Sequence, residues 1–172
     1  MVMLPAEGTE GTAADDAPEP ESGEGPRAEL LLFALGEEWY GLSVEQVAGV
    51  EPRRPVARLP GVPPSVLGLL LWHGEVIPAL DPAPLLTGRV SPPEDGYLVV
   101  GRAATGPVAL LVREVVAVVT IDPGAIEAPL PTVEPQRARL VSGQVQVEGR
   151  WVAVLALDTL VDALVREEHG RA

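Results

Sequence analysis

Two stretches of the chain share one plan, and they constrain the fold more than any other feature. Residues 68–81 read GLLLWHGEVIPALD, and residues 143–158 read GQVQVEGRWVAVLALD. In each, an apolar strand begins at a glycine, turns at a second glycine six residues on, and returns through an apolar strand to Leu-Asp. This pattern is typical of a β-hairpin. Its duplication predicts two similar lobes that are mostly strand.

The regions upstream of the hairpins repeat as well. Each half begins with a strand, a turn and a returning strand, and continues into a proline-rich segment. Proline has no backbone N–H to donate within a sheet, so this segment is expected to be an extended crossing loop. The first half places these at 30–35, 39–50 and 52–64, with a short helix at 63–67, and the second half at 97–101, 108–119 and 123–136. The spacing predicts a tail (1–28) and a domain (29–172) with lobe one (29–86), a connection (87–96), lobe two (97–157) and a C-terminal helix (158–168).

The terminal helix is indicated by apolar periodicity. Leu157, Leu160, Val161 and Leu164 lie at i, i+3, i+4 and i+7, which places them on one helical face. Asp158 is expected to be the N-cap.

Composition narrows the class of protein. The 172 residues include no cysteine, so a disulfide framework and a thiolate metal site are excluded. Aromatic residues make up 3 %, so the cores must be built from Val, Leu and Ala. No apolar run approaches the roughly 18 residues that a membrane span needs, and no secretory signal is visible. We expect a soluble cytoplasmic protein without membrane insertion.

Charge is strongly acidic. The net charge is −13, and the first 28 residues hold seven acids against one base. This segment has too few large apolar groups to offset its ordering entropy, so a disordered acidic tail is expected. An acidic surface repels phosphate backbones and anionic lipid, which argues against nucleic acid as a partner.

Candidate catalytic groups are few. His73 and His169 are the only histidines, and they are not spaced as metal ligands on one element. No serine lies in a Gly-x-Ser-x-Gly motif, and residues 101–106 have glycine spacing without the lysine of a phosphate loop, so they are expected to form a hairpin turn. Asp81 and Asp158 could form a paired-carboxylate site, but each ends a strand, where aspartate accepts backbone hydrogen bonds. We expect no catalysis, no metal and no cofactor.

Apolar surface is the alternative source of function. Val44, Val47 and Val50, together with residues 66–72 and 110–119, carry more aliphatic groups than one small barrel can enclose. Such a surplus indicates docking of a partner, although burial between the lobes accounts for part of it.

Motifs in both halves of the chain resemble those of a known family. The first half contains Phe33-Ala34-Leu35-Gly36, Tyr40-Gly41, Val47, Val50, Pro63, Gly68, Gly74, Val76-Ile77-Pro78 and Asp81, and the second half contains Leu110-Leu111-Val112, Val115, Val118 and Ser142-Gly143. Together these residues resemble CheW, the coupling protein of bacterial chemotaxis. The resemblance implies an all-β fold of two SH3-like five-stranded barrels side by side, with a short C-terminal helix. It also implies a non-catalytic adaptor that is a monomer when isolated and assembles in arrays.

The resemblance further implies partners and docking residues. The partners would be the cytoplasmic hairpin tip of a chemoreceptor and the regulatory domain of a CheA-type histidine kinase. Kinase docking would use Val47, Val50 and Gly68, and Gly68→Arg is expected to block it while leaving the fold intact. An apolar groove for the receptor helix would involve Val44, Leu110, Leu111 and Val112.

Two positions depart from the family pattern. The usual Asn-Leu-Arg-Gly turn is Leu71-Trp72-His73-Gly74 here, so His73 replaces an arginine, and the usual Val-Asp is Val112-Arg113. Histidine lacks the guanidinium's five donors, so partner choice is expected to differ at His73 and Arg113. Four alternatives stay open: a scaffold of a chemosensory array that controls pili or a second messenger, a detached kinase regulatory domain, a carboxylate enzyme, and a protein that binds a small ligand between the lobes.

Overall fold

The computed structural model describes residues 26–89, 96–129 and 135–171. Most of the expected tail and connection therefore lies outside the described residues. The elements are β2 (Ala28–Leu35), β3 (Glu38–Ser43), η3 (Val44–Gln46), β4 (Val47–Pro52), β5 (Val66–Trp72), β6 (Glu75–Leu80), α1 (Ala83–Thr87), β7 (Tyr97–Ala103), β8 (Gly106–Val112), β9 (Glu114–Ile121), η4 (Pro123–Ala125), α2 (Pro135–Ala138), β10 (Val141–Val147), β11 (Arg150–Leu155) and α3 (Leu157–Arg171).

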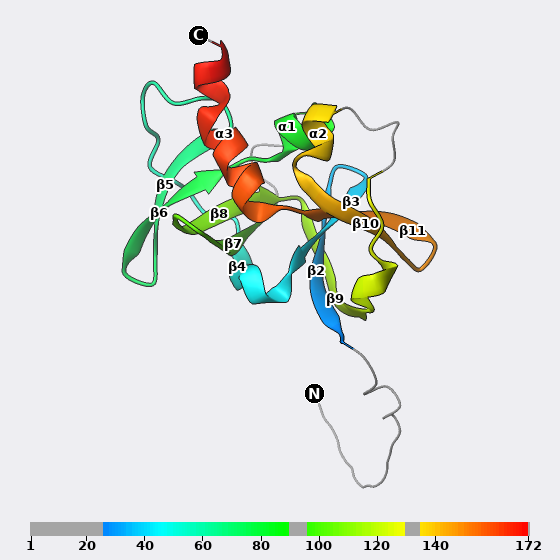
Figure 1. Ribbon diagram of the computed structural model, residues 1–172. Coiled ribbons are helices and arrows are strands. Elements are labelled where there is room, and N and C mark those ends of the chain that lie inside the picture. The colour runs from blue at the N-terminus through cyan, green and yellow to red at the C-terminus, as the bar shows by residue number, and fades with distance from the viewer. Residues whose placement is uncertain (1–25, 90–95, 130–134, 172) are drawn as a thin grey trace, which may run out of the picture.

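The strands form two five-stranded sheets, ordered β10-β11-β3-β2-β9 and β4-β7-β8-β6-β5. The expected fold class, mostly β with a C-terminal helix, is confirmed. Figure 1 shows the sheets side by side, with β5 and β6 at one end of the molecule and β10 and β11 at the other. When β2 to β6 are matched to β7 to β11, the second sheet has the order of the first, so the duplication is a structural repeat.

The sheets do not follow the expected consecutive lobes. β2 and β3 from the first half join β9, β10 and β11 from the second, while β7 and β8 join β4, β5 and β6. The cause is a break in each expected returning strand. Residues 39–50 are interrupted by η3, and residues 108–119 are interrupted at Arg113, so the chain leaves one sheet there and enters the other. The two halves are therefore intertwined.

The two hairpins have matching geometry. β5 pairs antiparallel with β6, and β10 pairs antiparallel with β11, each with one register shift near the start of the first strand. Both turns have positive φ at two successive residues, His73 and Gly74 in one and Glu148 and Gly149 in the other. This is the backbone of the two-residue turn that matches the twist of paired strands.

A crossing segment bridges the edge of each hairpin. Ala57, which follows β4, exchanges backbone hydrogen bonds of 2.7 and 2.8 Å with Leu69 of β5. Glu127, which follows β9, exchanges bonds of the same lengths with Gln144 of β10. Each crossing thus ties one edge of its sheet to the other, and the sheet curls around its own interior. Residues 63–67, where a helix was expected, are instead a turn and the start of β5.

The core has three parts. One sheet encloses Leu70, Ile77, Ala79, Leu98, Val100, Ala109 and Leu111, and the other encloses Leu30, Leu32, Val145, Val152 and Val154. The third and largest part, which we call the central core, joins the two sheets to α1 and α3; it includes Phe33, Leu80, Val99, Leu110, Val112, Leu155, Leu160 and Leu164. Much of the aliphatic surplus in the sequence is therefore buried between the sheets.

α3 contributes the expected apolar face, because Leu157, Leu160, Val161 and Leu164 all belong to the central core. Its start differs from the expectation. The helix begins at Leu157, and the Asp158 carboxylate accepts a hydrogen bond of 2.7 Å from the Ala104 N–H in the β7–β8 turn. Asp158 therefore does not cap its own helix but ties the helix to the turn of residues 101–106, which forms a hairpin as expected. None of the helices in the described ranges is long and apolar enough to cross a membrane.

Tyr40 in the central core gives this fold a pH dependence. Burial raises the pKa of its phenol well above the usual 10, and the hydrogen bond that the phenol donates to the Glu38 carboxylate raises the pKa further. The folded state thus keeps the proton that the unfolded chain loses above about pH 10. The free energy of unfolding should be constant with respect to this group below pH 10 and should fall as pH rises above it. Urea titrations between pH 8 and 11 should show the fall, and Tyr40→Phe should make it shallower; equal slopes in both proteins would contradict the assignment.

Candidate docking surface

Among the described residues, the large aliphatic side chains with the highest exposed fractions lie on the outer face of the β5–β6 hairpin. Leu71 and Val76 are opposite each other in the strand register and are 60 % and 63 % exposed. Residues on a strand alternate between faces, so their neighbours Leu70 and Ile77 point into the sheet's own core. Further along β6 the same outer face enters the central core at Leu80. The exposed pair is therefore the open end of an apolar face.

Arg54 holds this part of the surface in place. Its guanidinium makes an ion pair of 2.7 Å with the Glu51 carboxylate and donates a hydrogen bond of 2.5 Å to the Leu71 carbonyl. The arginine thus links the end of β4 to β5. Sequence reasoning placed residues 66–72 on the apolar surface but did not single out Leu71 and Val76, because alternation alone does not show which end of a strand is covered.

A second exposed apolar site lies where β4 pairs with β7. Val50 is 43 % exposed and Tyr97 is 41 % exposed. Pro52 is the register partner of Tyr97, two residues beyond Val50, so these side chains share one face of the sheet. Val47 is half-buried and packs against the central core. Of the expected kinase-docking residues, Val50 is therefore the one with an exposed side chain.

Gly68 does not lie on an open docking edge. The residue is buried, and a Cβ added there would lie 2.2 Å from the Ala57 carbonyl oxygen. Gly143, its counterpart in the second hairpin, would meet the Glu127 carbonyl oxygen at 2.8 Å. At both glycines, the backbone that approaches closely belongs to a crossing segment of the same chain. The expectation that Gly68→Arg leaves the fold intact is therefore wrong, because a side chain there collides with Ala57.

The expected receptor groove is filled. Leu110, Leu111 and Val112 are at most 1 % exposed. Leu110 and Val112 pack in the central core, and Leu111 packs inside its sheet. Val44, in η3, is half-buried against the central core. The three β8 residues therefore hold the protein together and present no surface to a partner.

The two positions that depart from the family pattern are exposed. His73 occupies the β5–β6 turn with φ 49°, and its ring stacks on Trp72 with centroids 4.4 Å apart. The Arg113 guanidinium donates a hydrogen bond of 2.8 Å to the Gly36 carbonyl, and its backbone N–H donates to the Ala34 carbonyl. Arg113 thus fastens the point at which β8 passes into β9. His73, at the tip of the hairpin that bears Leu71 and Val76, is better placed to contact a partner.

The carboxylates of Asp81 and Asp158 each accept a hydrogen bond from a backbone N–H. The buried Asp81 carboxylate accepts a hydrogen bond of 3.1 Å from the Ala83 N–H, at the start of α1. Asp158 is exposed and bonds to Ala104 as described above. Among the residues that the structure describes, no three His, Asp or Glu side chains are grouped so that they could hold a metal ion.

Comparisons with known proteins agree with this architecture. A family model described as CheW-like domain matches residues 29–165. A chemotaxis protein CheW from Rhizobium meliloti is 26 % identical over 141 residues, which cover 81 % of this chain and 90 % of that protein. A chemotaxis protein CheW from Bacillus subtilis is 24 % identical over 138 residues, or 77 % of this chain and 86 % of that one.

A solved structure supports the fold. The crystal structure of the scaffolding protein TtCheW from Thermoanaerobacter tengcongensis superposes with a TM-score of 0.71 at 24 % identity, covering 80 % of this chain and 90 % of that chain. The family model spans most of the chain, and the sheets, the crossings and the terminal helix form the fold of such a scaffold. The chain therefore belongs to the CheW-like family of non-catalytic scaffold proteins of chemotaxis signal transduction.

Proposed function

We propose that the protein works in the cytoplasm as an adaptor that couples chemoreceptors to a CheA-type histidine kinase. The observation that carries the kinase contact is the exposed pair Leu71 and Val76, at the open end of a face that enters the central core at Leu80. Exposed aliphatic surface of this kind is typical of protein docking. Val50 and Tyr97 add a second apolar contact on the same sheet.

The receptor contact is proposed at η3, where the chain passes from one sheet to the other. Val44 and Val47 are half-buried there, and Glu45 between them is exposed. A receptor helix lying over this crossing would touch both sheets at once, because β3 and β4 belong to different sheets. The adaptor would then shift the kinase between its states by contacting one state more favourably than the other.

Val76→Glu tests the kinase contact. A carboxylate at the centre of an apolar interface is buried without a partner, so affinity for the kinase regulatory domain should fall at least about tenfold. Isothermal titration calorimetry with the purified regulatory domain measures the change. The fold should be unaffected, because the side chain is 63 % exposed.

Val118→Glu is the matched control. Val118 is 55 % exposed on β9, in the other sheet, so the same chemical change is made away from the proposed interface. Binding to the regulatory domain should match that of the unaltered protein. If Val76→Glu and Val118→Glu bind equally well, the kinase contact does not lie on the β5–β6 hairpin.

A further inference from the structure

The outer faces of the two hairpins occupy equivalent places in the repeat but differ in chemistry. When the hairpins are aligned at their opening glycines, Leu69 is matched by Gln144, and Val76 is matched by Trp151. Aliphatic groups on the β5–β6 hairpin are thus replaced by an amide and an indole on the β10–β11 hairpin. The second face therefore suits a ligand that combines hydrogen bonding with a flat apolar group.

A cavity of about 300 Å³ lies on this face of the β10–β11 hairpin. Ala153 is paired in register with Gln144 on one side and with Tyr40 on the other. Trp151, two residues before Ala153 on the same face, is 43 % exposed. Because Ala153 is small, the space between the three larger side chains stays open, and all four residues line the cavity. The volume is at the lower end of the range for ligand pockets, about 300 to 1,000 Å³, so the cavity suits a small molecule.

The Gln144 side chain is buried without a partner for its amide nitrogen. It is 9 % exposed, and among the residues that the structure describes Nε2 has no hydrogen-bond partner. A buried donor without an acceptor destabilises the folded state, and such groups are rare in proteins. The last torsion of a glutamine side chain has a broad profile, so the amide can turn Nε2 toward an acceptor in the cavity.

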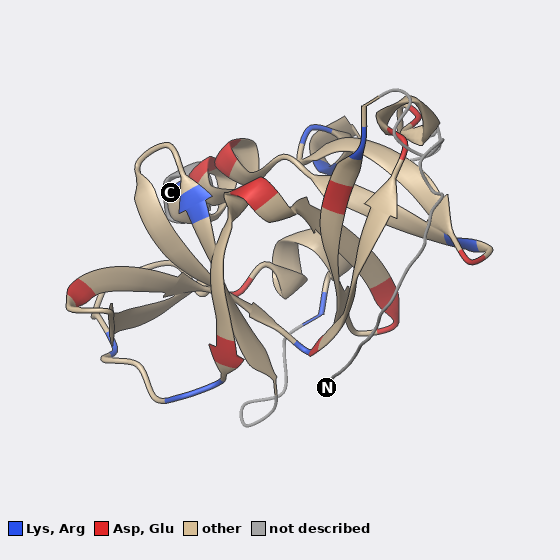
Figure 2. Ribbon diagram, turned by 90° about the horizontal axis from the view of Figure 1, so that it is seen from below, with Lys and Arg blue, Asp and Glu red and all other residues tan. Residues whose placement is uncertain are grey.

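Charged groups around the cavity disfavour an anionic ligand. Figure 2 shows both a basic and an acidic stretch at the tip of this hairpin. The Arg150 guanidinium lies 4.3 Å from the centre of the Trp39 ring and donates a hydrogen bond of 2.7 Å to the Glu37 carbonyl, so it is already engaged within the molecule. Glu37 and Glu38 line the same cavity, and their carboxylates repel an anion. A neutral ligand is therefore favoured.

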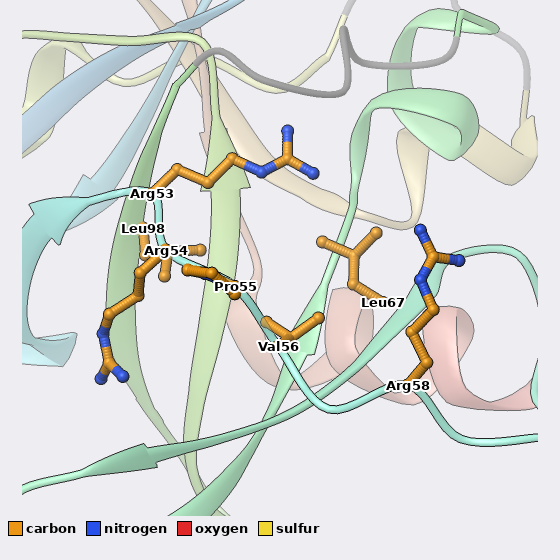
Figure 3. Close-up of a pocket in the computed structure, with 7 residues that line it drawn as sticks. All are labelled: Arg53, Arg54, Pro55, Val56, Arg58, Leu67 and Leu98. Carbon is orange, nitrogen blue, oxygen red and sulfur yellow. The ribbon is translucent and has the colours of Figure 1, made fainter.

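Aromatic side chains are concentrated at this cavity. The chain has three Trp, two Tyr and one Phe, and Trp39, Tyr40 and Trp151 all line it. By contrast, the cavity of about 380 Å³ beside the crossing from β4 to β5 is lined by arginine, proline and aliphatic residues (Figure 3). Aromatic rings prefer to stack with an offset or to meet edge to face, so an aromatic ligand gains specific contacts in the first cavity.

We propose that the cavity on the β10–β11 hairpin binds a small neutral aromatic carboxamide. The ligand's amide pairs with the Gln144 side chain: its carbonyl accepts from Nε2 and its N–H donates to Oε1, because a primary amide has both donors and an acceptor. The aromatic ring of the ligand lies against Trp151. The two hairpins are at opposite ends of the molecule (Figure 1), so this site does not rest on the kinase contact proposed for Leu71 and Val76.

Benzamide, the simplest ligand of this class, tests the site in the full-length protein. A ligand this small should bind with a Kd on the order of 1 mM. In isotope-edited NMR titrations, the side-chain amide signals of Gln144 and the indole signal of Trp151 should shift saturably. The indole of Trp72, in the other sheet, should not shift. No saturation by about 20 mM, or shifts at Trp151 without shifts at Gln144, would overturn the proposal.

Benzoate tests the charge preference. It keeps the ring but carries a negative charge and no N–H, so it should bind at least about threefold more weakly than benzamide. Benzoate that binds as tightly as benzamide would contradict the assignment of a neutral carboxamide.

Gln144→Leu removes the amide and keeps a side chain of similar size. Benzamide should then bind at least about tenfold more weakly, because its hydrogen bonds are lost. The ligand-free variant should also unfold at a higher urea concentration, because a buried donor without a partner is removed. Gln146→Leu makes the same change at an exposed position of β10 and should leave the affinity and the urea midpoint nearly unchanged. Equal affinities in the two variants, or a lower midpoint in Gln144→Leu, would refute the role of Gln144.

Discussion

Gly68→Ala is expected to lower the free energy of unfolding by about 3 kcal/mol, through backbone strain and overpacking together. Gly68 has φ 149°, and the new Cβ would lie 2.2 Å from the Ala57 carbonyl oxygen and 2.8 Å from its carbonyl carbon. Those are backbone atoms of the crossing, so relief requires displacing the Ala57–Leu69 bridge. Urea denaturation followed by circular dichroism measures the loss.

Gly106→Ala separates the collision from the backbone conformation. Gly106 also has positive φ, at 129°, but nothing lies within 4 Å of its added Cβ. Its substitution should cost only the conformational penalty, about 1 to 2 kcal/mol. The difference between the two variants measures the collision. If Gly68→Ala costs no more than Gly106→Ala, Ala57 does not limit the space at Gly68.

Leu110→Ala is expected to cost about 2 to 5 kcal/mol of stability, which is the range for removing a buried leucine side chain from a packed core. Leu110 is fully buried in the central core, between the two sheets and α3. Its loss weakens the contact on which both sheets depend, so the protein should still unfold in one transition at lower urea. Val118→Ala, at a site that is 55 % exposed, should change stability by less than about 0.5 kcal/mol.

This result also decides how receptor-binding data on β8 are interpreted. If Leu110→Ala leaves stability within about 0.5 kcal/mol of the unaltered protein, the residue is not a core residue and the groove hypothesis regains support. If stability falls as expected, loss of receptor binding in such a variant follows from a weakened fold. A direct receptor contact is then better probed at η3, where Glu45 is exposed.

The hairpins were predictable because their information is local. Alternation in residues 68–81 and 143–158 assigns each side chain to a face, and the glycine at the second turn position permits positive φ. The terminal helix was predictable for the same reason, since its apolar period places four residues on one face. Its first turn was predicted less well, because Asp158 is bound by Ala104, which lies far from it in sequence.

The sequence predicted only in part which apolar residues are exposed. Of the residues expected to contact partners, Val50 is exposed, but Gly68 and the β8 residues Leu110, Leu111 and Val112 are buried. The sequence does not show whether an aliphatic side chain on a strand packs against a partner or against the chain's own second sheet. Leu71 and Val76 could be identified only from the structure, which shows which end of this apolar face is buried and which end is exposed.

The sequence by itself determined that the chain contains two copies of one strand plan, where each hairpin turns, and which side chains share a face. Only the tertiary structure decided that β3 and β4, and likewise β8 and β9, separate into different sheets, so that each sheet combines both halves. It also decided that the backbone close to Gly68 is Ala57 of the same chain. The physical reason is that side-chain alternation and turn chemistry act over a few residues, whereas strand pairing and burial depend on residues far apart in the chain.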